Sequence, residues 1–199
     1  MTTTTASKQD IDQLLRELIC GNDERAEQAA QALGACGCEV VDALRGTAHS
    51  TEPDQRWWTA RVLGQFRCEA AQQLLSELLE DAESDVRACA AFSLGEARAE
   101  SAVQALAQHL KDSSVYVSAM ASDALARIGQ PSTLVLIDRL KNGTALERSR
   151  AAKALLAILD SRSIPALIAA LDDESPVVEH YAAEALTRLG VGTVLIKPS

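Results

Sequence analysis

The sequence is poor in aromatic residues and has no long apolar stretch. Only two Trp, two Tyr and two Phe occur among its 199 residues, so each aromatic position is informative. No run of about 18 apolar residues is present, as a transmembrane helix would need. The N-terminal segment, MTTTTASKQD, lacks the apolar core of a secretory signal, and we expect residues 1–9 to form a flexible tail.

Basic residues are also in deficit. The chain has 19 Lys and Arg against 28 Asp and Glu, a formal net charge of −9 and a pI of about 4.8. Non-specific binding to DNA or RNA requires a basic surface, so we expect no nucleic-acid partner. The same acidity disfavours binding to an anionic membrane surface, and we expect no membrane partner.

A zinc-site spacing is also lacking among the five cysteines. Their odd number and the missing signal segment favour a reducing compartment. We therefore expect a cytoplasmic protein whose cysteines are buried or half-buried small residues. No catalytic, cofactor-binding or metal-binding residue is predicted, and no cofactor.

What the sequence does contain is a repeat with a period of 30 to 31 residues. A leucine preceded by two small residues recurs six times, as Leu33, Leu63, Leu94, Leu125, Leu155 and Leu186. In the clearest copy, residues 86–112, two amphipathic helices are joined by a tight turn, and neither could bury its apolar side alone. The pattern predicts an all-α protein in which about six two-helix repeats stack on one another.

The ends of the array differ from its middle. A helix over residues 10–19 precedes the first repeat and is expected to cap the stack. No linker interrupts the array, so we expect one continuous domain over residues 10–199. The sixth repeat is truncated after Val194, Leu195 and Ile196, and these apolar residues make the C-terminal end a candidate site of self-association.

Two of the cysteines occupy the same position of successive repeats. Cys38 and Cys68 each follow their repeat leucine by five residues. Stacked helices lie about 8–10 Å apart, whereas an unstrained disulfide needs Cα atoms within about 7 Å. We therefore expect no disulfide between them.

The repeat motif resembles the HEAT-like repeats named after the phycobilisome lyases. Its best copies are VRACAAFSLG at residues 86–95, RSRAAKALLAILD at 148–160 and VEHYAAEALTRLG at 178–190. The resemblance implies a right-handed α-solenoid of antiparallel helix pairs, with the motif helices lining the concave face. One HEAT-like enzyme, deoxyhypusine hydroxylase, binds iron through His-Glu pairs after the Arg position. Only His180 stands at such a place here and no glutamate follows it, so the sequence leans against an enzyme.

The outward positions of the motif helices form the candidate binding site on the concave face. They hold aromatic, methionine and cationic side chains, which are enriched at protein-binding hot spots: Trp57, Trp58, Arg61, Phe92, Met120, Arg150, Lys153, His180 and Tyr181. The alternative is that these residues, one of the two tryptophans in particular, pack against the neighbouring repeat.

The sequence thus favours a non-catalytic scaffold that binds a protein or peptide partner in a concave groove. The resemblance implies an alternative, a bilin lyase, chromophore-transfer or bilin-detaching component acting on phycobiliproteins. In that case the aromatic residues would stack on the tetrapyrrole, and Arg61, Arg150 and Lys153 would pair with its propionates.

Overall fold

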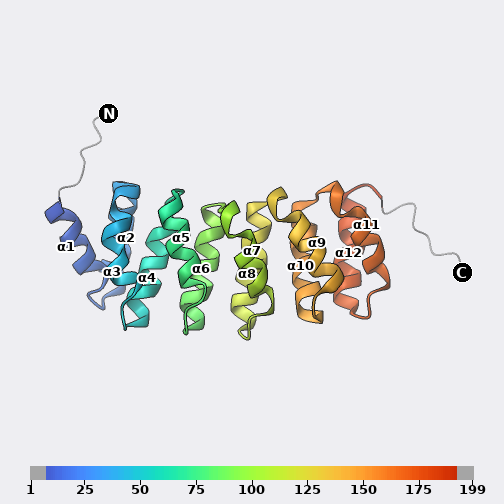
Figure 1. The fold of residues 1–199 in the computed structure, drawn as a ribbon, viewed down its shortest axis with the longest axis horizontal. Helices are drawn as coiled ribbons and strands as arrows, with labels where there is room; N and C mark the ends of the chain where they lie inside the picture. The colour runs from blue at the N-terminus through green and yellow to red at the C-terminus, as the bar shows by residue number, and fades with distance from the viewer. Residues whose placement is uncertain (1–7, 192–199) are drawn as a thin grey trace, which may run out of the picture. The chain divides into compact units, whose positions relative to one another are not determined.

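The computed structural model describes residues 8–191, which contain twelve α-helices and no strand (Figure 1). The all-α prediction is confirmed. The chain divides into two compact units, Met1–Ala99 and Glu100–Ser199, which we call unit 1 and unit 2. That residues 10–199 form one continuous domain stays a prediction.

Unit 1 is a two-layer stack of helices. Helices α2, α4 and α6 pack in succession as one layer, α3 and α5 form the other, and α1 packs against α2. The bounds are Lys8–Leu18 for α1, Asp23–Cys36 for α2, Val41–Ala48 for α3, Pro53–Leu63 for α4, Glu69–Leu78 for α5 and Ser84–Glu96 for α6. Helix α1 matches the predicted capping helix but begins at Lys8, two residues earlier than expected.

Unit 2 has the same two-layer construction. Helices α8, α10 and α12 form one layer, and α7, α9 and α11 form the other. The bounds are Val103–Gln108 for α7, Val115–Ile128 for α8, Thr133–Asn142 for α9, Ala145–Ile158 for α10, Ile164–Ala169 for α11 and Pro176–Arg188 for α12. Short 3₁₀ turns before α7, α9 and α11 shorten the connections between paired helices. We call α2, α4, α6, α8, α10 and α12 the motif helices, because they carry the repeat motif.

The six repeat leucines form the centre of the core. Each is at most 1% exposed, which confirms the predicted register. The two small residues before each leucine are also buried in the first five repeats, where they let neighbouring helices approach closely. In the sixth repeat Ala182 is buried but Ala183 is exposed, because no further described helix packs on α12.

In α4, α6 and α10 the repeat motif has an arginine, which ties the motif helix to a nearby turn. Arg56 donates two hydrogen bonds to the carboxylate of Asp81 (2.6 and 2.8 Å), and Arg148 does the same to Asp173 (2.8 and 3.1 Å). Both guanidinium groups also bond backbone carbonyl groups of the turn before their helix. These arginines are about 15% exposed, so we interpret them as structural rather than as ligand-binding residues.

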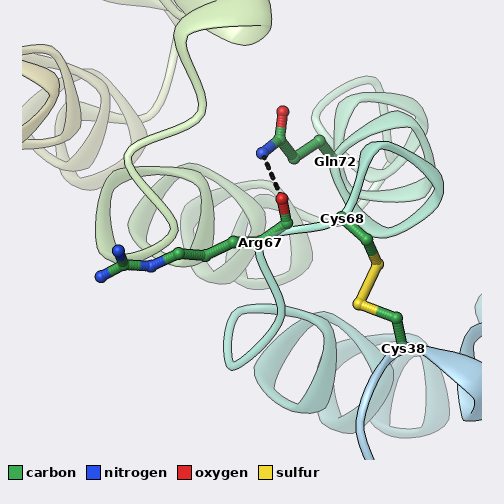
Figure 2. Close-up of a disulfide and its surroundings, with 4 residues drawn as sticks. All are labelled: Cys38, Arg67, Cys68 and Gln72. Carbon is green, nitrogen blue, oxygen red and sulfur yellow. Dashed lines mark hydrogen bonds between the residues drawn. A yellow bond between two sulfur atoms is a disulfide. The ribbon is translucent and has the colours of Figure 1, made fainter.

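The disulfide prediction was wrong, because Cys38 and Cys68 form a disulfide (Figure 2). The expectation used the spacing between helix axes, but neither cysteine lies within an α-helix. Cys38 follows Gly37, whose φ of 84° turns the chain sharply, and Cys68 is the N-cap of α5. In these two turns the Cα atoms are 6.4 Å apart, which is within bonding range. Cys20, Cys36 and Cys89 remain free thiols.

Two predictions fall outside the part of the chain that the structure describes. Residues 1–7 belong to the expected tail, and Val194, Leu195 and Ile196 belong to the C-terminal segment expected to self-associate. That self-association stays a prediction. Among the helices of residues 8–191, none has the length and apolar character needed to span a membrane.

Candidate binding site

The two tryptophans of the predicted site lie in α4 and are half-buried. Their rings meet edge to face, with centroids 4.9 Å apart and an interplanar angle of 89°. The carbonyl group of Trp57 accepts a hydrogen bond from the thiol of Cys89 in α6 (3.6 Å). The pair is therefore partly packed within unit 1 and partly accessible.

A hollow of about 420 Å³ lies on the motif-helix layer of unit 1. Its wall combines charged, polar and aromatic groups from α2, α4 and α6 and from the turn after α4, among them Glu27, Gln31, Arg61, Gln65, Arg67 and Phe92. Gly64 forms part of its floor, where an added Cβ would lie 2.7 Å from the Cβ of Ser93. The absence of a side chain at Gly64 therefore lets α4 and α6 approach closely.

Two of the charged groups in this hollow pair with each other. Arg61 donates two hydrogen bonds of 2.9 Å to Glu27, 34 residues earlier in the chain, and holds the pKa of that carboxyl below its usual value. Gln65 donates to the carbonyl oxygen of Ala30 (3.0 Å). Phe92 is 39% exposed at the same hollow, so the surface combines an accessible ring with a neutralised ion pair.

Cys89 also lines the hollow but is not a nucleophile. Burial raises the pKa of its thiol to about 12, so the sulfur stays protonated at neutral pH. The thiolate, not the thiol, is the reactive form of cysteine. The hollow therefore offers a surface for contact with a partner but no activated sulfur.

Unit 2 carries the remaining predicted residues on α8, α10 and α12. Lys153 is bonded to Asp123 (2.8 Å), and His180 lies 3.7 Å from Glu184 and against the ring of Tyr181. Met120, Arg150, Lys153 and Tyr181 are half-buried, whereas His180 is exposed.

Arg150 is the one cation of the predicted set that makes no ion pair within residues 8–191. It donates to the carbonyl oxygen of Val115 (3.2 Å), and its Nε is buried without a partner.

The structure thus brings Arg61 and Phe92 to one hollow, which Trp57 and Trp58 do not line. The assignment of the nine residues to partner binding stays a prediction. Sequence reasoning missed the exposed apolar residues at the start of the unit 2 motif helices, Tyr116, Leu146 and Val177. Aligning the six repeats on their leucines would have found them, because the same position is acidic in the first three repeats.

Stacked helix pairs with a repeating leucine core define the class of α-helical repeat proteins. The chain matches the family model of HEAT repeats over residues 11–91 and 71–155, which together span more than half of its length. It also matches the PBS lyase HEAT-like repeat over residues 147–173. The protein belongs to the HEAT repeat family, and the suspected resemblance is confirmed.

Solved structures share this fold at low sequence identity. The Escherichia coli protein YibA is 22% identical with a TM-score of 0.62, covering 97% of this chain and 74% of that one. The CpcE–CpcF complex of phycocyanin lyase from Nostoc sp. PCC7120 is 20% identical with a TM-score of 0.55, covering 96% and 80%. A designed armadillo repeat protein in complex with the peptide (KR)4 is 17% identical with a TM-score of 0.53, covering 90% and 99%. No curated protein matches the chain.

Proposed function

We propose that the protein is a non-catalytic scaffold that binds a protein or peptide partner on the outward face of its motif helices. One observation carries the proposal. All six aromatic residues lie within the described chain, and only Phe66 is buried, at 3% exposure. Large aromatic side chains usually bury most of their area, and those left partly exposed are typical of binding hot spots.

The fold supports the same proposal. A designed armadillo repeat protein with a similar fold was solved with a peptide bound. In this chain the predicted face offers the hollow at Phe92 in unit 1 and the half-buried Met120 and Tyr181 in unit 2. A peptide bound to either unit by itself buries apolar surface there without any chemical step.

The alternative function is a bilin lyase or bilin-transfer component, and it rests on two likenesses. Residues 147–173 match a PBS lyase HEAT-like repeat, and the chain is similar in fold to a phycocyanin lyase complex. However, Arg61 and Lys153 are already bonded to Glu27 and Asp123. Two of the three cations expected to bind propionates are therefore neutralised, and we prefer the scaffold.

Peptide selection tests the proposal. The full chain is panned against a random peptide phage library, and an enriched peptide is titrated by fluorescence anisotropy. We expect Trp58→Ala or Phe92→Ala to weaken binding roughly tenfold or more. Leu134→Ala is the matched control, because Leu134 is an exposed leucine on α9. Helix α9 belongs to the layer of unit 2 that does not contain the motif helices. The scaffold proposal fails if no peptide is enriched or if all three variants bind equally. A visible spectral shift on titration with a free bilin would favour the alternative.

We also propose a cytoplasmic location, supported by the three free thiols, of which Cys20 is exposed. Cytosolic thiols are kept reduced, so the Cys38–Cys68 pair would be a dithiol there. Alkylation of the protein in a rapidly quenched extract counts its thiols. Five labelled thiols agree with a cytoplasmic location, whereas three would indicate an oxidising compartment.

A further inference from the structure

The second residue of each motif helix differs between the two units. In unit 1 it is acidic, as Glu24, Asp54 and Asp85, and in unit 2 it is apolar, as Tyr116, Leu146 and Val177. All six side chains are exposed. Each stands nine residues before its repeat leucine, so the comparison is between equivalent positions.

An acidic residue at this position stabilises its own helix. The first turn of a helix has unpaired N–H groups and a partial positive charge, which favour a carboxylate. At this position the unit 2 helices have no carboxylate, although α10 and α12 carry Glu147 and Glu179 elsewhere in the first turn. They instead expose Tyr116 by 59%, Leu146 by 37% and Val177 by 50%. A single exposed apolar residue is ordinary. Three at equivalent positions of three successively packed helices form a row, which is typical of an interaction surface.

The row is continuous with the predicted binding face. Residues four apart lie on the same side of a helix, so each row residue is followed by one of that face, namely Met120, Arg150 or Tyr181. Arg150 lies next to the row, because it donates to the carbonyl oxygen of Val115, the residue before Tyr116. As it makes no ion pair within residues 8–191, its guanidinium favours a carboxylate from a partner.

The charges of the two units agree with an acidic partner at unit 2. Unit 1 contains 17 acidic and 9 basic residues, whereas unit 2 contains 11 acidic and 10 basic residues. A carboxylate near unit 2 therefore meets little net repulsion from that unit.

We propose that Tyr116, Leu146 and Val177 are the docking row for an extended peptide segment of a partner protein. Packed helices lie about 8–10 Å apart, and an extended segment in the polyproline II conformation advances about 3.1 Å per residue and directs every third side chain to the same side. The segment therefore carries an apolar side chain at every third residue, with a carboxylate beside the middle one that pairs with Arg150. This inference rests on the proposed scaffold function and names its partner class.

The test uses the full chain and the same random peptide phage library. In the triple variant Tyr116→Asp, Leu146→Asp, Val177→Asp, the row has the acidic pattern of unit 1, which suits a first helical turn. We expect the wild type to enrich peptides with apolar residues at every third position and an acidic residue between them. The triple variant should bind such a peptide roughly tenfold more weakly or worse, and Arg150→Gln should lose the preference for the acidic residue. The matched control, Glu24→Gln, Asp54→Gln, Asp85→Gln, should bind like the wild type.

Three results would overturn the inference. The first is enrichment with a spacing other than three, and the second is equal binding by the wild type and the triple variant. The third is a concentration-dependent dimer in sedimentation that the triple variant abolishes, because a second copy would then cover the row. If the triple variant binds normally while Phe92→Ala does not, the row is excluded but the scaffold function stands. If no peptide is enriched at all, both proposals fail.

Discussion

Units 1 and 2 are built from the same repeat but join their successive turns by different chemistry. In unit 1 the disulfide between Cys38 and Cys68 joins two turns, each five residues after its repeat leucine. The equivalent positions in unit 2 are Gln130 and Asp160. There Arg162 donates to the carbonyl oxygen of Gln130 (3.0 Å), and Asp160 accepts from Thr133 (3.0 Å). The same connection is thus sensitive to reduction in one unit and to protonation in the other.

The two units also differ on their surfaces while agreeing in their cores. Every repeat leucine is buried in both units, yet the second residue of the motif helices is acidic in one and apolar in the other. Stacking therefore constrains the buried positions and leaves the outward positions free to diverge. Four measurements would break or sharpen this comparison.

The largest effect is expected from removing the disulfide. The bond closes a loop with a sequence separation of 30, and in the chain-entropy model Cys38→Ser, Cys68→Ser should lower the free energy of unfolding of unit 1 by about 3–4 kcal/mol. Both tryptophans lie in unit 1, so urea unfolding followed by tryptophan fluorescence reports on this unit. Cys20→Ser, which removes an exposed free thiol, is the control. If the urea midpoint measured by fluorescence is unchanged in the double variant, the disulfide does not stabilise unit 1, and the two units do not differ in this respect.

An intermediate effect is expected from Asp160→Ala in unit 2. The substitution leaves the buried hydroxyl of Thr133 without its acceptor and should cost about 1–3 kcal/mol. Unfolding followed by circular dichroism should detect this loss of stability. Tryptophan fluorescence should not, because both tryptophans lie in unit 1.

The effect of Asp160 should also depend on pH. Hydrogen bonds from Arg162 lower the pKa of Asp160 from 3.8 to about 2. Because the folded pKa is depressed, the carboxylate stabilises the fold above about pH 4, and this contribution is lost as the pH falls towards 2. The stability difference between the wild type and Asp160→Ala should shrink over that range. A stability difference between the two proteins that does not change with pH would contradict the stabilising role of the ionised Asp160 carboxylate.

The smallest effect is expected from exchanging the first-turn residues. Tyr116→Asp, Leu146→Asp and Val177→Asp should each stabilise their helix by about 0.3–1 kcal/mol at low salt. The reverse change Asp54→Leu should destabilise α4 by a similar amount. Melting temperatures at low and high salt measure both, and the differences should decrease as salt screens the helix dipole. Destabilisation by the three aspartates would mean that the apolar row has a structural role.

Much of the fold was predictable because its signal is local. The period of the small residues and leucines sets which side of each helix is apolar, and that side is buried whatever its neighbours are. The candidate site was less accessible to sequence reasoning. The bond between Arg61 and Glu27 joins residues 34 apart. Nothing in the local pattern predicts which cation has an acidic partner and which, like Arg150, makes no ion pair within residues 8–191.

The sequence by itself determined the two-helix repeat, its register and the family, because all three follow from the periodic burial of small residues and leucine. Only the tertiary structure decided how the turns are joined. It brought Cys38 within reach of Cys68, although helix spacing had argued against the bond. It also showed that the motif arginine pairs with the acidic residue 25 positions later, as Arg56 does with Asp81. The physical reason is that both connections link residues from different turns, whose distance depends on backbone geometry that no local pattern encodes.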